Sequence, residues 1–545
     1  MNNPYSPKFF EAMKTYSWNQ FFKDVVSGII VAIIALPLSI ALALASGVGP
    51  EQGIYTAIFA GFVISFLGGS LVQIAGPTAA FASIVAGIVA TKGFDGLVLA
   101  TIMAGIILII MGFLRLGNLI KFIPYTITCG FTFGIAVTIV IGQIKDFLGL
   151  TFVNSPISSI DKLTECIRCI STFNYQALII GLISLAILIW WPKKLQKVPS
   201  SLVAVIVSIL LVKLLKMDVK TIGDLYTISN KIPLPHVSSF DFNMVKDLLP
   251  NAFTIAVLAG IESLLSCVVS DSMIGSRHKP NAELIAQGAG NIVSALFGGI
   301  PATGAIARTA ANINNGGRSP VAGMVHSITL LLILVVLMPY AAWIPMPAIA
   351  AILFMVAYNM SGWKTCVRLL KVSPKSDIAV VVLTFVLTVV FDLVVAIEIG
   401  FFLAVILFLV RMTNETEVKE WHVLKDDPDA IIHERVPSNT KIYEITGPMF
   451  FAVADKIMDI ETSKGIETVI IRMRSVPAMD ITALRQLRNL HILCQHKGIT
   501  LILSHVNEQP YKMMEKAHFI EEVGKENFCH NIDAALSRAI YVNTK

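Results

Sequence analysis

The 545-residue chain is too apolar for a water-soluble globular protein: 55% of its residues are hydrophobic, only 14% are charged, and its mean hydropathy is +0.74. This composition predicts a protein that folds in a lipid bilayer. The net charge of +6 is spread over loops beside the apolar stretches, so it predicts membrane topology and no nucleic-acid partner.

Residues 1–23 lack an apolar core followed by a small-residue cleavage site, which predicts a cytoplasmic N-terminal segment and no removable signal peptide. A transmembrane domain is predicted at 24–412, because its apolar stretches approach the roughly 20 residues that a helix needs to cross a bilayer. We predict fourteen helical spans at 24–45, 51–68, 77–91, 96–114, 119–143, 174–192, 199–215, 248–271, 283–298, 301–314, 319–339, 343–360, 376–391 and 393–412.

Basic residues such as Arg277, Lys279 and Arg318 collect in the loops on one side of these spans, whereas the short loops of the other side carry few. Cytoplasmic loops are the ones enriched in Lys and Arg. The bias therefore predicts a multi-pass protein of the inner (plasma) membrane with both termini in the cytoplasm, and an even number of spans agrees with this topology.

Two landmarks of the first half of the membrane region return in the second half. Pro77 and Pro301 open two short apolar segments 224 residues apart, and Pro124 of "FIPYTI" and Pro345 of "WIPMPA" are 221 residues apart. These similar spacings predict a duplication, with repeat one at about 24–215 and repeat two at about 248–412. Because each repeat holds an odd number of spans, the two copies have opposite orientations, an arrangement typical of transporters.

The segments 77–91 and 301–314 are too short to cross the membrane, so we expect half-helices that begin inside it, at "GPTAAFAS" and "PATGAIART". The first N–H groups of a helix lack intrahelical partners, and its N-terminal end carries about half a positive charge. Two such ends facing one cavity predict an anion site, with the Thr78 hydroxyl as a further donor. Alternatively, the small residues only let helices pack closely, but two segments at equivalent repeat positions favour the site.

Two ionisable residues within the spans are candidate functional groups. Arg308, about two turns into the second half-helix, would add a full positive charge to the anion site; alternatively, it reaches the cytoplasmic face or a structural carboxylate. Glu262, in the middle of the eighth span, is a candidate for proton coupling, because a carboxyl group in the membrane can bind and release a proton. Two alternatives stay open: Glu262 binds sodium together with Ser266 on the same helical face, or it forms a salt bridge with Arg308.

Seven cysteines are scattered along the chain, and only Cys166 and Cys169 have a spacing seen in metal sites. No second pair completes a set of four ligands. We therefore expect no bound metal, and no other cofactor is indicated.

The charged tail predicts a linker at 413–437 and a soluble α/β domain at 438–545. Strands are predicted at "TKIYEITGPMFF", "ETVIIRMRSV" and "ITLILSHV", and helices at "TALRQLRNLHILCQHKG", "QPYKMMEKAHF" and "NIDAALSRAIYV". Asp480 is the predicted N-cap of the first of these helices. The domain has neither a phosphate-binding glycine loop nor a catalytic pair, so no enzyme activity is expected.

The chain as a whole resembles the SulP (sulfate permease-type) anion transporters with a C-terminal STAS domain, and in particular bacterial members for sulfate or dicarboxylates. The resemblance lies in "ALPLSIALALASGVGPEQGIYTAI", "GPTAAFAS", "IESLLSCVVSDSM", "RHKPNAELIAQGAGNIVSALFGGIPATGAIARTAANINNGG" and "MDITAL". It implies a seven-plus-seven inverted repeat divided into a core and a gate domain, elevator-type movement and a homodimer.

The same resemblance implies a set of substrate-binding residues: Thr78, Ala79, Ala80, Phe81, Gly304, Ala305, Ile306, Ala307 and Arg308. Many relatives have Ser where this chain has Ala307, so contacts here would rest more on backbone N–H groups. Sodium-coupled bicarbonate members tend to carry Asp at the position of Glu262. Glu at this position therefore favours a proton, and not sodium, as the coupling ion. Thr482 takes the place of a Ser that single-domain STAS proteins phosphorylate, which makes it a candidate regulatory site beside a docking surface for a cytoplasmic partner.

The resemblance thus implies proton-coupled secondary active transport of a small inorganic or carboxylate anion, sulfate or a C4-dicarboxylate such as succinate, by a protein surrounded by membrane lipid. Bicarbonate transport, with sodium or protons, and an anion channel or exchanger remain as alternatives. A nucleobase permease would need neither Arg308 nor a STAS-like tail, and a membrane-tethered signalling protein would not need paired half-helices.

Overall fold

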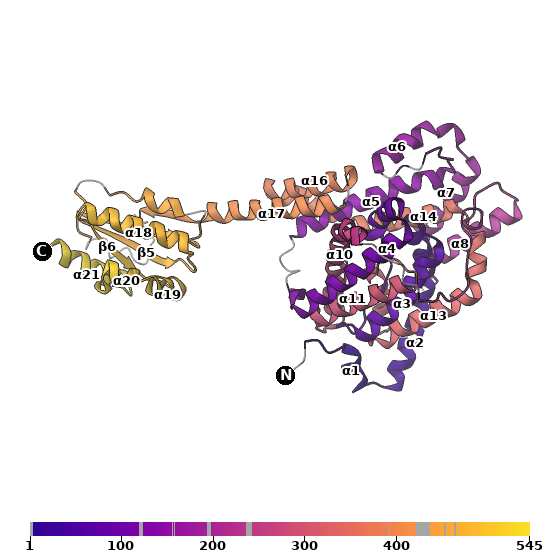
Figure 1. Ribbon diagram of the computed structural model, residues 1–545, viewed down its shortest axis with the longest axis horizontal. Helices are drawn as coiled ribbons and strands as arrows, with labels where there is room; N and C mark the ends of the chain where they lie inside the picture. Colours follow the sequence, from indigo (N-terminus) through magenta and orange to yellow (C-terminus); the bar gives the residue numbers. More distant parts are fainter. Residues whose placement is uncertain are drawn as a thin grey trace. The chain divides into compact units, whose positions relative to one another are not determined.

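The protein is seen here as a computed structural model that divides into two units, Met1–Phe402 and Leu403–Lys545 (Figure 1). The structure describes all residues except 1–3, 119–123, 155, 157, 193–197, 236–241, 392, 421–435, 452–453, 463–464 and 545. The start of the predicted span 119–143 and most of the predicted linker 413–437 therefore lie outside the described residues. The first unit is mostly helical, and the second contains a five-stranded sheet.

The helices of the first unit overlap every predicted span, four short helices of the described residues lie outside these spans, and the last helix continues into the second unit. They are α1 (Lys8–Met13), α2 (Trp18–Ala45), α3 (Pro50–Leu67), α4 (Ala82–Phe113), α5 (Tyr125–Leu148), α6 (Ser159–Arg168), α7 (Tyr175–Trp190), α8 (Ser200–Leu214), α9 (Ile222–Leu225), α10 (Phe242–Ile274), α11 (Pro280–Leu296), α12 (Ile306–Asn314), α13 (Val321–Leu337), α14 (Met346–Ser361), α15 (Trp363–Val372), α16 (Lys375–Val390) and α17 (Leu393–Glu415), with short 3₁₀ turns η1 (Ala79–Phe81), η3 (Ile170–Thr172) and η5 (Met338–Trp343). Within the described residues, six helical segments are long and apolar enough to cross a membrane: Trp18–Ala45, Ala79–Phe113, Tyr125–Leu148, Phe242–Ile274, Val321–Trp343 and Met346–Val372.

Two of the predicted spans, 77–91 and 96–114, form one helix, α4, that is interrupted at Gly93. Gly93 has φ 70°, a left-handed conformation that breaks the helical hydrogen-bond ladder. Glycine adopts this conformation with little strain because it has no Cβ atom. The bend therefore falls between the two predicted spans, as the sequence indicated.

The helices of the first unit pack in two groups. In one group α4 packs against α10 and α11, α2 against α13, and α3 against α11 and α13. In the other, α5 packs against α14 and α16, and α14 against α7. The helix α12 packs against α10 and α2, so the first group contains both segments that were predicted to be half-helices.

The two predicted half-helices begin later than expected, because each is preceded by a short strand. Strand β1 (Ala75–Gly76) pairs antiparallel with β2 (Thr303–Gly304), so that Ala75 faces Gly304 and Gly76 faces Thr303. Pro77 and Pro301 therefore lie in the non-helical approach, and the helices start only at Ala79, in η1, and at Ile306, in α12. The pairing places the two helix starts next to each other although they are more than 200 residues apart in sequence.

The second unit is an α/β domain with the strand order β3-β4-β5-β6-β7, in which β3 is antiparallel to β4 and the other neighbours are parallel. Its elements are β3 (Glu417–Glu420), β4 (Thr440–Thr446), η7 (Ala454–Asp459), β5 (Thr468–Ser475), α18 (Ile481–His496), β6 (Thr500–Ser504), α19 (Glu508–Lys516), α20 (Phe519–Val523), η8 (Lys525–Asn527), β7 (Phe528–Cys529) and α21 (Ile532–Asn543). The three predicted strands and three predicted helices are confirmed, whereas β3, β7 and α20 were not predicted.

Residues of β5 alternate between the two faces of this sheet. Val469 and Ile471 join a core with α18, while Ile470 joins a second core with Leu536 of α21. The predicted N-cap is confirmed, since the Asp480 carboxylate accepts a 2.9 Å hydrogen bond from the Ala483 N–H.

Candidate functional site

The two helix starts beside the β1–β2 pair expose unpaired backbone N–H groups. In α12 the first intrahelical bond runs from the Thr309 N–H to the Ala305 carbonyl at 2.9 Å, and the Ala305 N–H is bound to the Ile74 carbonyl. The N–H groups of Ile306, Ala307 and Arg308 thus have no earlier helical carbonyl to bind, as at any helix start. An anion placed there would meet donors and the positive end of the helix dipole.

The first helix start is joined to α10 by the side chains of Thr78 and Glu262. The Thr78 hydroxyl donates to Glu262 Oε2 at 3.0 Å, and both residues are partly accessible. A threonine hydroxyl has a single hydrogen, so Thr78 cannot donate to Glu262 and to an anion at the same time. The predicted substrate donor and the predicted coupling residue are therefore in direct contact.

Arg308 lies in the first turn of α12, so the prediction that it is two turns into the half-helix was wrong. The reason is that residues 301–305 are extended or belong to β2 and do not extend the helix. Its side chain is 2% exposed, and Nη2 donates to Ser39 Oγ and to the Pro77 carbonyl, each at 3.3 Å. Within the described residues, Nε and Nη1 have no hydrogen-bond partner, and Arg308 forms no ion pair with Glu262.

The buried guanidinium passes close behind β1. A Cβ atom added to Gly76 would lie 2.4 Å from Arg308 Nη1, closer than any real contact. Gly76 thus allows the cation to approach the backbone that leads into η1. A positive charge without a carboxylate partner, in a medium of low dielectric constant, raises the electrostatic potential at both helix starts.

The Ser266 hydroxyl does not bind the Glu262 carboxylate, although both residues lie on α10. Its hydroxyl is fully buried and faces Thr309 Oγ1 at 3.5 Å, and that oxygen accepts a 3.0 Å bond from the Ile74 N–H. In this structure Ser266 lies where α10, α12 and β1 pack together.

The predicted substrate-binding residues differ in accessibility. Ala79, Ala80, Phe81 and Gly304 are buried, and Phe81 is 0% exposed. Ile306 and Ala307 are exposed, and Thr78 and Ala305 are partly exposed. A solute that approaches the helix starts would therefore meet Thr78, Ile306 and Ala307 first.

A cleft of about 600 Å³ runs along α4, α5 and α6 and reaches the first turn of α4. At this end it is lined by Ala82 and Ser83, which directly follow η1, and at the other by Asp161 and Lys162 of α6. It brings solvent to within one turn of the first helix start.

A buried carboxylate that was not predicted from the sequence, Glu283, supports the approach to β1. Glu283 is 0% exposed and accepts hydrogen bonds from the Gly69 N–H at 2.9 Å, Gln73 Nε2 at 2.7 Å, Ser263 Oγ at 3.0 Å and Gln287 Nε2 at 3.0 Å. Four donors can stabilise a buried carboxylate without a cation. A sequence signal was present, because Glu283, Gln287 and Asn291 recur every four residues and form one polar stripe on α11.

The last member of this stripe, Asn291, holds the approach to β2. Its amide donates to the Ala302 carbonyl at 2.9 Å and accepts from the Ala302 N–H at 2.8 Å. Both groups are buried, and extended backbone within a membrane must find such partners inside the protein. Asn291 thereby fixes the segment that leads into the second helix start.

A helical membrane unit that holds paired helix starts and a buried cation, followed by an α/β domain, defines a membrane transport protein with a soluble module. The chain belongs to the sulfate permease family, whose profile matches residues 21–384, and residues 428–535 match the STAS domain. The family predicted from the sequence is confirmed.

Relatives along the whole chain agree with this assignment. The Bacillus subtilis protein named "Putative sulfate transporter YvdB" is 38% identical over 536 residues, covering 96% of this chain and 99% of that protein. The "Bicarbonate transporter BicA" of a Picosynechococcus species is 29% identical, covering 95% of this chain and 94% of that protein. Both relatives are named as transporters.

Solved structures support the fold. The murine anion transporter Slc26a9 aligns with a TM-score of 0.88 at 18% identity, covering 99% of this chain and 94% of that chain. The transmembrane domain of a cyanobacterial BicA aligns with a TM-score of 0.64 at 30% identity, covering 70% of this chain and 98% of that chain. The fold is therefore that of an anion transporter with a mostly helical membrane domain and a C-terminal STAS domain.

Proposed function

We propose that the protein carries out proton-coupled secondary active transport of a small oxyanion, sulfate or a C4-dicarboxylate such as succinate, across the inner (plasma) membrane. The observation that carries this proposal is the 3.0 Å hydrogen bond between Thr78, at one helix start, and Glu262. It connects a residue that can bind an anion with a residue that can bind a proton.

The hydrogen bond suggests how the proton and the anion bind together. An ionised Glu262 accepts the Thr78 hydrogen and repels an approaching anion. Protonation removes the negative charge and lets Glu262 donate to Thr78 Oγ1, so that the Thr78 hydroxyl can turn its own hydrogen to the anion. Protonation of Glu262 thus favours anion binding, which is the requirement for symport.

The anion itself would be held mainly by backbone N–H groups. Those of Ile306 and Ala307 lie at the exposed start of α12, and those of Ala79 and Ala80 at the start of η1. Because Ala307 lacks a hydroxyl, the second helix start offers no side-chain donor at that position. Arg308 is proposed to act through its field and not by direct contact, since its guanidinium is buried beside Pro77.

The two helix groups suggest the movement that carries the anion. We propose that the group with α4, α10 and α12 moves as a core domain against the group with α5 and α14, in an elevator-type motion by a homodimer embedded in membrane lipid, built on a seven-plus-seven inverted repeat. Both termini are proposed to lie in the cytoplasm.

The STAS domain is proposed to regulate transport through a cytoplasmic partner. Thr482 is exposed in the first turn of α18, two residues after the N-cap Asp480. A phosphoryl group there would interact favourably with the positive end of the helix dipole. Thr482 is thus accessible to a kinase without a change in the fold.

The test is uptake of labelled sulfate, succinate and bicarbonate into proteoliposomes, with and without an inward proton gradient. We expect the gradient to drive accumulation of sulfate or succinate above equilibrium, and a protonophore to abolish it. Glu262→Gln should abolish the response to the gradient, whereas Thr91→Val, which changes a hydroxyl on α4 away from the site, should behave as wild type. Gradient-independent uptake in wild type, or normal coupling in Glu262→Gln, would contradict the proposal.

Bicarbonate is the second candidate substrate, because two relatives that cover 95% of this chain are named bicarbonate transporters. In the same assay this candidate predicts bicarbonate uptake that sulfate does not inhibit, driven by sodium or protons. An anion channel would instead give uptake that never exceeds electrochemical equilibrium, and an exchanger would need a counter-anion inside the vesicles.

A further inference from the structure

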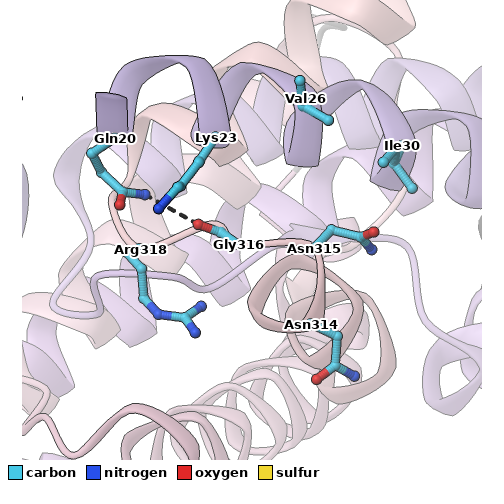
Figure 2. A pocket seen from close by; sticks show the side chains of 8 residues that line it. All are labelled: Gln20, Lys23, Val26, Ile30, Asn314, Asn315, Gly316 and Arg318. Atoms are coloured by element: carbon cyan, nitrogen blue, oxygen red, sulfur yellow. Dashed lines mark hydrogen bonds between the residues drawn. The ribbon is translucent and has the colours of Figure 1, made fainter. Parts of the chain in front are cut away.

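A cleft of about 700 Å³ lies at the end of α12 that is opposite to the proposed anion site (Figure 2). One wall is α2, which contributes Gln20, Lys23, Val26 and Ile30, and the other is the segment that ends α12, with Asn314, Asn315, Gly316 and Arg318. Figure 2 shows Lys23 extending from α2 toward this segment. We call it the α2–α12 cleft.

The α2–α12 cleft contains the ammonium group of Lys23, which no carboxylate of the described residues contacts. Lys23 is exposed, and no hydrogen bond or ion pair of its ammonium group occurs within the described part of the chain. The nearby Asp24 is 0% exposed and accepts bonds from Tyr16 at 2.8 Å, Gln20 at 2.9 Å and Ser319 at 2.5 Å. Since these donors already surround Asp24, it is not available to Lys23.

The C-terminal end of α12 would repel an anion unless its exposed carbonyl groups were neutralised. Arg318 does this, because its Nη1 donates to the Ile313 carbonyl at 2.8 Å and to the Gly317 carbonyl at 2.7 Å. The Gly316 carbonyl accepts from Gln20 Nε2 at 3.1 Å. Arg318 thus offsets the partial negative charge at the C-terminal end of α12. Lys23 remains as the positive charge that a ligand would meet.

An accessible face of α12 connects the α2–α12 cleft to the proposed anion site. Ile306, Ala307, Ala310, Ala311 and Asn314 are all exposed or partly exposed, and they recur at helical spacing along one face. Eight helical steps from Ile306 to Asn314 correspond to about 12 Å. An anion that leaves the helix starts along this face would reach Lys23 next.

We infer that the α2–α12 cleft is a second oxyanion site, in which Lys23, the amide of Asn314 and one N–H of the Asn315 amide hold a sulfate, carboxylate or phosphate group. The other N–H of Asn315 donates to the Ala311 carbonyl at 2.8 Å. This ligand has two sources. One is the transported anion, and that source rests on the proposed function. The other is the phosphate group of an anionic lipid, whose acyl chain would follow the apolar Val26 and Ile30 beside the cleft.

The experiment compares Lys23→Gln with Lys14→Gln, which removes an exposed lysine close in sequence but outside the cleft. Both variants should fold, because the Lys23 ammonium group forms no hydrogen bond or ion pair with any described residue. In vesicles of phosphatidylcholine alone, we expect Lys23→Gln to raise the KM for anion at the cytoplasmic face about fivefold with unchanged kcat, if the transported anion is the ligand. That change is about 1 kcal/mol.

The lipid source is tested without transport. Trp18 is exposed at the start of α2. The part of the tryptophan fluorescence quenching that disappears in Trp18→Phe comes from Trp18 and therefore reports lipid near this residue. If lipid phosphate is the ligand, brominated phosphatidylglycerol should quench Trp18 more strongly than brominated phosphatidylcholine, and Lys23→Gln should remove the difference.

The outcomes separate the two proposals. A change in either assay that is specific to Lys23→Gln supports the oxyanion site and identifies its source. If Lys23→Gln equals Lys14→Gln in uptake, in the quenching assay and in direct binding of labelled sulfate to the purified protein, the inference is overturned. Absence of anion uptake in wild type would contradict the proposed function, while quenching and sulfate binding would still decide the second site.

Discussion

The contact between Thr78 and Glu262 predicts that substitutions of the two residues are not additive. A hydrogen bond at 3.0 Å is worth about 0.5–1.5 kcal/mol between neutral groups and about 1.5–3 kcal/mol to a charged acceptor. We expect a coupling energy of about 1–2 kcal/mol in kcat/KM between Thr78→Val and Glu262→Gln, or roughly 5- to 30-fold. Thr78→Ser keeps the hydroxyl and should restore most of the activity.

The measurement is initial uptake of sulfate or succinate into proteoliposomes under an inward proton gradient, for wild type, both single variants and the double variant. Thr91→Val combined with Glu262→Gln is the control cycle, because the Thr91 hydroxyl bonds to the Gly87 carbonyl of its own helix. Effects of Thr78→Val and Glu262→Gln that add within about 0.5 kcal/mol would refute the reasoning.

Two further predictions concern the support of the site. Gly76→Ala would place a Cβ 2.4 Å from Arg308 Nη1, so we expect it to displace the guanidinium, lower the free energy of unfolding by about 1–3 kcal/mol and strongly reduce uptake. Gly87→Ala, where nothing lies within 4 Å, is the control, and equal behaviour of the two variants would contradict this view of Arg308. Asn291→Leu leaves the buried N–H and carbonyl of Ala302 without their partner, at about 1–3 kcal/mol each, and should lower the unfolding midpoint in mixed micelles; an unchanged midpoint would contradict the assigned role.

The positions of the helices could be predicted from the sequence because hydrophobic length and Gly or Pro breaks are local signals. Each predicted span overlaps a helix in the described residues, and the bend at Gly93 falls between the two spans that together form α4. The same holds for the STAS domain, where alternating apolar residues predicted β4, β5 and β6 and the local capping signal predicted Asp480.

The starts of the half-helices could not be predicted, because they are set by pairing between distant segments. Proline can open a helix, so Pro77 and Pro301 were reasonable starts. The β1–β2 pair instead uses the backbone of Gly76 and Thr303 for interstrand contacts and delays both helices. This delay also explains why Arg308 lies in the first turn and not two turns further on.

The supporting side chains of the site show a common arrangement: each approach strand is held by groups from the other half of the chain. Asn312, from α12, donates to the Val72 carbonyl at 2.8 Å ahead of β1, and Arg308 donates to the Pro77 carbonyl just after it. From the first half, the Thr56 hydroxyl accepts a 2.7 Å bond from the Ile300 N–H ahead of β2. Neither helix start is therefore fixed by its own half alone, and separation of the halves would leave buried backbone groups without partners. An elevator-type motion that preserves the anion site must accordingly move both helix starts together, as one rigid body.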